Sequence, residues 1–120
     1  MIQVGSFLTV IDNSGAKKVQ CLKILGNRKI GEIGDTILVS IKTVRSTSKI
    51  KKGEMRKGVI VQTAYPTKRK DGSSIVFNQN GIIIINNQDK PIATRILGVV
   101  TEELRAKKHL KILSLASKSI

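Results

Sequence analysis

The sequence predicts a mainly β protein: a small antiparallel barrel or sandwich that ends in short helices. Short runs rich in Ile, Val and Leu recur along the chain, and glycines with Asn or Asp separate them. Hydrophobic residues make up 40% of the chain and aromatic residues only 2%. These patterns are typical of barrels and sandwiches alike, so periodicity leaves both open. A chain of 120 residues forms one domain, with the β part over about 1–100 and the helical part over about 101–120.

The first half of the chain contains three predicted strands, over residues 7–11, 19–25 and 36–44. The sequence Asp-Asn-Ser-Gly at 12–15 is typical of a turn between the first two, and the three glycines of 26–35 indicate a loop. The third strand alternates best, because Ile37, Val39 and Ile41 fall on one side. Ser40 and Lys42 fall on the other, as in a half-buried strand.

The second half begins with a basic connection over 45–57 and a strand over 58–64. A basic arm then turns at Asp71-Gly72, a pair that favours the tight turn of a hairpin. Residues 82–85 are four isoleucines and predict a central strand, and 96–100 predict one more short strand.

Only the C-terminal part has a helical pattern. Thr101 is a suitable N-cap, with Glu102 and Glu103 in the first turn and basic residues further on. This order of charges complements a helix dipole. A second short helix is predicted over 110–115.

The charge of the chain indicates a polyanionic partner. Twenty-two Lys and Arg face eight Asp and Glu, which gives a net charge of +14. Such an imbalance repels itself in a free protein and is usual where a polyanion is bound. No amphipathic or lipidated segment stands out, so we expect nucleic acid and no membrane partner.

Catalysis, cofactors and metals are not expected. His109 is the only histidine and stands beside Lys108, not near an acid. Cys21 is the only cysteine, has no metal-ligand cluster around it, and fits a packed strand position. No phosphate loop, nucleophile elbow or His-Glu metal motif occurs.

Residues 58–84, GVIVQTAYPTKRKDGSSIVFNQNGIII, resemble the signature of the large-subunit ribosomal protein fourteen family. The shared spacing runs from the Gly and three aliphatics through Asp-Gly, Phe and Asn to two aliphatics, where Ile83 replaces the family's Val. Further blocks resemble the family in the same order: DNSGA at 12–16, PIATRI at 91–96, VTEELR at 100–105 and KILSLA at 111–116. Together they cover almost the whole chain.

The resemblance implies a closed five-stranded antiparallel barrel with a projecting β-ribbon and short C-terminal helices. It also implies a structural role in the large ribosomal subunit, with partners that include large-subunit rRNA and neighbouring large-subunit proteins. Contacts to small-subunit rRNA at intersubunit bridges, and to an assembly or silencing factor, are further expectations. Composition and charge fit equally well a free nucleic-acid-binding module, such as a nucleoid or messenger-RNA protein.

Basic residues gather in loops and at strand ends, where side chains reach outwards from a rigid core. With two polar residues of the first turn, they form the predicted rRNA-binding set: Asn13, Ser14, Lys17, Lys18, Arg28, Lys29, Arg45, Lys49, Lys51, Lys52, Arg56, Lys57, Lys68, Arg69 and Lys70. The resemblance places partner or bridge contacts at Thr94, Arg95, Arg105 and Lys111.

Aromatic residues bear on the kind of RNA. Phe7 and Phe77 lie in strand patterns and are predicted to be core, which leaves Tyr65 as the one candidate for base stacking. We therefore expect phosphate and sugar contacts to folded, largely helical RNA.

Composition also bears on compartment. Ile, Lys and Asn account for 40 of 120 residues, as in an AT-rich genome. We expect either no presequence or one that has been removed, and the end of the chain departs from the Ala-Pro-Glu ending associated with bacterial and plastid members. We expect a mitochondrial location, with the bacterial cytoplasm as the alternative.

Overall fold

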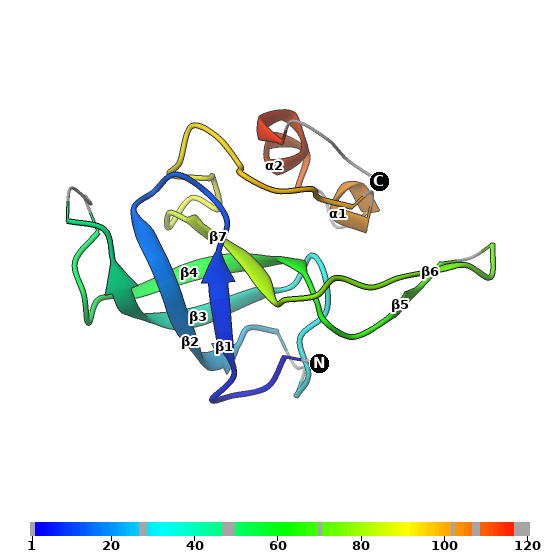
Figure 1. Ribbon diagram of the computed structural model, residues 1–120, viewed down its shortest axis with the longest axis horizontal. Coiled ribbons are helices and arrows are strands. Elements are labelled where there is room, and N and C mark those ends of the chain that lie inside the picture. Colours follow the sequence, from blue (N-terminus) through cyan, green and yellow to red (C-terminus); the bar gives the residue numbers. More distant parts are fainter. Residues whose placement is uncertain are drawn as a thin grey trace.

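The computed structural model describes residues 2–26, 29–46, 50–69, 71–101, 103–106 and 109–116. Five strands form a closed barrel: β1 (Phe7–Val10), β2 (Ala16–Ile24), β3 (Thr36–Val44), β4 (Met55–Gln62) and β7 (Gly81–Ile85). A two-stranded ribbon consists of β5 (Thr67–Lys68) and β6 (Ser74–Ile75). Two short helices follow, α1 (Glu103–Ala106) and α2 (Leu110–Leu115). The predicted five-stranded barrel, ribbon and short helices are confirmed (Figure 1).

The barrel is mixed rather than wholly antiparallel. Each strand runs antiparallel to the one before it, in the order β1, β2, β3, β4 and β7. With five strands the first and the last then point the same way, so the closing pair β1 and β7 is parallel. The expected antiparallel closure is therefore wrong for this one pair, and the odd number of strands is the reason.

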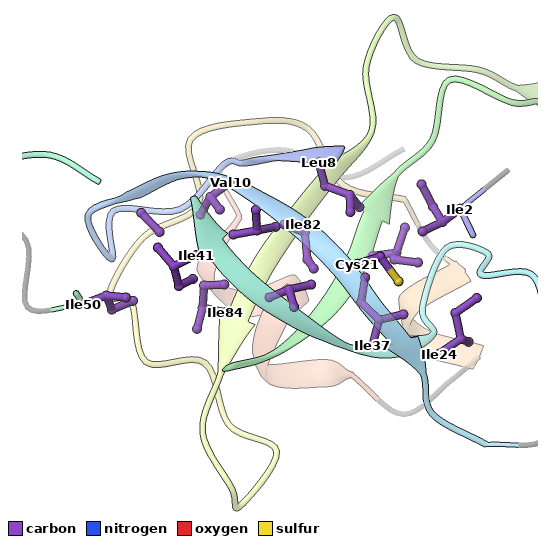
Figure 2. Close-up of a cluster of buried hydrophobic side chains, with 14 residues drawn as sticks. Ile2, Leu8, Val10, Cys21, Ile24, Ile37, Ile41, Ile50, Ile82 and Ile84 are labelled. Carbon is purple, nitrogen blue, oxygen red and sulfur yellow. The ribbon is translucent and has the colours of Figure 1, made fainter. Parts of the chain in front are cut away.

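The barrel interior is a closed aliphatic core. Alternate residues of the strands point inwards, among them Leu8, Ile37 and Ile82, which are at most 2% exposed. Figure 2 shows these side chains converging between the strands, with Ile50 at one end of the cluster and Ile2 and Ile24 at the other. Cys21 belongs to this core, and burial raises the pKa of its thiol. The predicted packing role of Cys21 is confirmed.

A second core covers the outside of β4 and β7. Ile82 and Ile84 face the barrel interior, whereas Ile83 and Ile85 face outwards. The outward pair packs with the C-terminal segment, including Leu104 and Ile112 of the helices, and Figure 1 shows α1 and α2 on this side of the molecule. A strand covered on both faces has no polar side, which explains the run of four isoleucines.

The prediction that Phe7 belongs to the core is wrong. Phe7 is 51% exposed, because Leu8 and Val10 take the inward positions of β1 and alternation turns Phe7 outwards. Phe77 is half-buried and packs against the second core, close to the expectation.

Residues 96–100 form no strand. The Leu97 amide donates to the carbonyl of Ile11, whereas the Ile96 amide donates to that of Leu115 at the end of α2. The backbone here divides its hydrogen bonds between two elements and makes only isolated bridges. Apolar composition had indicated burial correctly, since Ile96 and Val100 belong to the second core.

The ribbon projects from the barrel as the basic arm was predicted to do, and it lies along the long axis of the molecule (Figure 1). Asp71 and Gly72 lie at its tip, where Gly72 has a φ of +92°. The Asp71 carboxylate accepts hydrogen bonds from the amide and the hydroxyl of Ser73, which holds the turn. The Asp-Gly turn of the arm is confirmed.

Gly58 allows β4 and β7 to pack closely where they separate the two cores; we call this pair of strands the β4–β7 wall. It pairs with Ile84 of β7, and an added Cβ would lie 2.5 Å from Ile82 Cδ1 and 2.9 Å from the backbone oxygen of Ile83. The backbone oxygen cannot move without breaking the β4–β7 ladder. We expect Gly58→Ala to lower the free energy of unfolding by about 1–3 kcal/mol, as overpacking does. Urea denaturation measures this.

The matched control is Met55→Ala on the same strand, where the side chain is 66% exposed. This change should shift the unfolding free energy by no more than about 0.5 kcal/mol. Equal stability of the Gly58 variant and the wild type would show that β4 and β7 can move apart enough to accommodate a methyl group at this position.

Candidate nucleic-acid interface

Two of the predicted basic groups, one after the first turn and one in the connection after the third strand, come together at one end of the barrel. The amide of Arg45, just after β3, donates to the carbonyl of Gly15 at 2.8 Å, which places Arg45 beside the start of β2. Lys18 pairs with Thr43 across β2 and β3. Exposed Lys51 and Lys52 lie in the connection that follows β3. Lysines from β2 and from the β3–β4 connection thus share this end with Arg45.

Irregularities in β2 increase the number of outward lysines. The pairing with β3 shifts register between Ala16 and Val19, and again between Cys21 and Lys23. An extra residue in a strand interrupts the alternation of side chains. As a result Lys17 and Lys18 are both exposed, and so are Leu22 and Lys23.

The outer surface of β2 and β3 is basic, and the neighbouring strand β1 carries no charged residue. These three strands contain four lysines and no Asp or Glu. Two of the lysines, Lys23 and Lys42, were not in the predicted set, yet both are exposed. We call the outward side chains of these strands the basic face. The sequence indicated exposure of Lys42 through its polar position in the alternation of β3. Exposure of Lys23 follows from the shift of register between Cys21 and Lys23, which only the pairing with β3 shows.

Three predicted contact residues instead hold carboxylates. Arg56 binds Glu54 at 3.0 Å, and Lys57 lies 3.7 Å from Asp89. Arg69 of the ribbon donates to Glu103 of α1 at 2.7 Å, across 34 residues of sequence. Part of the charge of these three residues is therefore balanced within the protein. Lys29 and Lys68 are exposed, as expected.

The pair of Arg69 and Glu103 connects the ribbon, close to its turn, to the C-terminal helices. Burial raises the pKa of Glu103, but hydrogen bonds, first of all from Arg69, outweigh this effect. The pKa of Glu103 therefore lies below its ordinary value. The carboxylate stays ionised and holds the arginine at neutral pH.

The turn after β1 uses its polar side chains inside the protein. The carboxylate of buried Asp12 accepts from the amide and hydroxyl of Ser14 and from the amide of Ile84. The Asn13 side-chain oxygen accepts from the amides of Thr94 and Arg95, at 3.0 and 3.1 Å. Its amide nitrogen donates to the Thr94 hydroxyl at 2.9 Å. Asn13 thus positions the segment that carries Thr94 and Arg95.

Thr94 and Lys111 lie on one hollow of about 560 Å³, which Lys90, Pro91 and Leu115 also line. Both are exposed, as is Arg95. The structure therefore brings two of the predicted partner contacts together on the C-terminal flank. The side chain of Arg105 lies outside the described part of the chain, as do Arg28, Lys49 and Lys70.

Two other features, metal-ligand clusters and membrane-spanning helices, are not found in the described ranges. No group of three His, Cys, Asp or Glu side chains there is placed to hold a metal ion. None of the helices in those ranges is long and apolar enough to cross a membrane.

We expect Asn13→Ala to release the segment that carries Thr94 and Arg95. Two amides lose their acceptor, so their hydrogen exchange should accelerate and the free energy of unfolding should fall by about 1–2 kcal/mol. Hydrogen exchange by NMR measures the two amides directly. Asn78→Ala, at an exposed asparagine, should leave both exchange rates unchanged. Unchanged protection of both amides in the Asn13 variant would contradict the positioning role.

We expect Glu103→Gln to lower the unfolding free energy at pH 7 by about 1 kcal/mol, because Arg69 loses its ionic partner. The pKa of Glu103 is lower in the folded protein than in the unfolded chain, so this contribution is present above the ordinary range of glutamate. It disappears as the pH falls through the lowered pKa. Denaturation of both proteins from pH 7 to pH 3 should show the difference closing. Glu54→Gln, which removes a local pair, should have a smaller effect. A difference independent of pH would contradict the ionic origin.

The comparison with known families covers the whole chain. Residues 1–120 match the family described as Ribosomal protein L14p/L23e. The match includes the barrel, the ribbon and the C-terminal helices described above. The chain therefore belongs to the L14p/L23e family of large-subunit ribosomal proteins.

Proposed function

We propose that this protein is a structural constituent of the large ribosomal subunit that binds large-subunit rRNA through the basic face and the adjoining loops. The observation that carries the proposal is the acid-free surface of β1, β2 and β3, which continues into exposed Arg45, Lys51 and Lys52. Four lysines without a carboxylate among them on these strands concentrate positive potential. A phosphate backbone is the polyanion that such a surface suits.

The proposed rRNA contacts fall into two groups. Lys17, Lys18, Arg45, Lys51 and Lys52 contact phosphates directly from one end of the barrel, and Lys49 belongs to the same connection. Residues near the ribbon and the other loops add further contacts: Arg28, Lys29, Lys68 and Lys70.

The remaining predicted contacts have a mixed role in this proposal. Arg56 keeps its carboxylate partner and offers its other guanidinium donors to RNA, since an arginine carries five N–H groups. Arg69 is a proposed contact of the ribbon that stays bound to Glu103. Lys57 keeps its contact with Asp89 and offers the remaining N–H groups of its ammonium to RNA. Asn13 and Ser14 act mainly through the protein contacts described above.

The C-terminal flank is the proposed side for other partners. Thr94, Arg95, Arg105 and Lys111 contact neighbouring proteins, small-subunit rRNA at intersubunit bridges, or an assembly or silencing factor. The hollow shared by Thr94 and Lys111 supports a contact with a protruding side chain or nucleotide. Residues 1–120 act as one domain. The Ile-, Lys- and Asn-rich composition supports a mitochondrial ribosome, with a bacterial one as the alternative.

Sedimentation of a native lysate tests the proposed function. The protein should migrate with the large subunit and the monosome in a sucrose gradient, at moderate and at high salt. If it stays at the top of the gradient, or is released at moderate salt, it is a free nucleic-acid-binding module and the proposal fails.

Binding to large-subunit rRNA should depend on salt through Lys51 and Lys52. We expect the double change Lys51→Gln and Lys52→Gln to reduce the slope of log affinity against log salt by about 2, roughly one for each phosphate that is no longer neutralised. Filter binding over a salt series measures the slope. The control is Arg56→Gln, which removes a charge already paired with Glu54 and should change the slope by less. An unchanged slope in the double variant would show that the two lysines only solvate the surface.

A further inference from the structure

Phe7 is an aromatic ring without a place in either core. It is 51% exposed on β1, while Leu8 and Val10 fill the barrel. The ammonium of Lys18, from β2, lies over the ring at 4.9 Å from its centroid. A lysine within about 6 Å of a ring centroid is in cation–π contact. The ring is thus held on the basic face next to a positive charge.

An exposed aromatic ring on a basic face suits one kind of ligand especially well. Unpaired nucleotides stack their bases on aromatic side chains while cations bind the flanking phosphates. Phe7 supplies the apolar surface, and the Lys18 ammonium lies over one face of its ring. A base that stacks on this face takes the place of the ammonium, which then binds the flanking phosphate. No carboxylate occurs on β1, β2 or β3 to repel the phosphates.

Tyr65 offers a comparison within the same protein. It is also 51% exposed, but it lines a hollow of about 470 Å³ together with Glu32 and Lys68, which carry opposite charges. Phe7 instead lies on strands that contain lysines and no carboxylate. Of the two exposed rings, Phe7 therefore has the more uniformly positive surroundings.

We propose that Phe7 and Lys18 form a stacking site for an unpaired base of the bound RNA. The proposal rests on the proposed rRNA-binding function and makes it more specific. The lysines of the basic face then bind the phosphate backbone, and Phe7 binds a base that is not stacked in a helix. Base contact at Phe7 replaces the sequence-based expectation that only Tyr65 is available for stacking.

Binding of two RNA probes to the full-length protein tests this site. One probe is a short single-stranded oligoadenylate that carries 2-aminopurine, and the other is a fully paired duplex of the same length. We expect Phe7→Leu to weaken binding of the single strand about five- to a hundredfold and to abolish the stacking quench of 2-aminopurine. Affinity for the duplex should stay unchanged, because its bases are already stacked.

Two further variants serve as controls. Phe7→Trp should restore single-strand binding and quenching, since it keeps an aromatic ring. Tyr65→Leu removes an equally exposed ring and should have no effect. Thermal melting of each variant checks that the fold is intact, which is expected because Phe7 is outside both cores.

Three results would overturn the proposal. Full single-strand binding by the Phe7→Leu variant would show that the exposed side chain meets an apolar protein partner or solvent. Equal weakening of both probes would indicate a general weakening of the basic face. Weaker binding with Tyr65→Leu in place of Phe7→Leu would move the stacking site to the hollow. None of these results affects co-sedimentation of the wild type with the large subunit, so failure of the stacking site is distinct from failure of the proposed function.

Discussion

The β4–β7 wall, buried on both sides, is the constraint on which the rest of the structure depends. Ile82 and Ile84 pack in the barrel interior, and Ile83 and Ile85 pack in the second core. Such a strand is stable only if something covers its outer face, because exposed aliphatic surface costs about 25 cal/mol per Å² relative to burial. The C-terminal segment provides that cover through residues such as Leu104 and Ile112. Barrel and helical part are therefore held together by one hydrophobic wall.

This arrangement divides the surface of the protein between two tasks. The side of β4 and β7 is occupied by the protein's own C-terminal part, and the ribbon is tied to it by Arg69 and Glu103. On the side of β1, β2 and β3, the lysines of β2 and β3 are exposed among the described residues. A net charge of +14 opposes folding by self-repulsion, and a bound polyanion would relieve this repulsion. Fold and proposed RNA binding thus depend on the same asymmetry.

Local patterns predicted most of the strands, and long-range contacts explain what they missed. The bounds of β3 were predicted residue for residue, since one face is buried and the other is polar. β4 begins at Met55, three residues before the predicted start, because Met55, Arg56 and Lys57 pair with β3 without being apolar. The strand expected over 96–100 failed because its hydrogen bonds go to two different elements.

The candidate site was predictable in composition but not in arrangement. Loop lysines were identified from charge alone, whereas the shifts of register in β2 that expose Lys17 with Lys18 depend on pairing with β3. The partnership of Arg69 with Glu103 spans 34 residues and has no local signal. The outward position of Phe7 followed from strand alternation, but only once Leu8 and Val10 were known to face the barrel interior.

Amine labelling of the protein, free and within assembled large subunits, tests the central claim most directly. Reactivity of each lysine is read by mass spectrometry. The account predicts strong protection in the subunit for the lysines of the basic face and its adjoining loop: Lys17, Lys18, Lys23, Lys42, Lys51 and Lys52. Lys90, on the C-terminal flank, should be protected less than these lysines in the isolated subunit, which lacks the small-subunit partners. Equal reactivity of the basic-face lysines in both states would contradict the account.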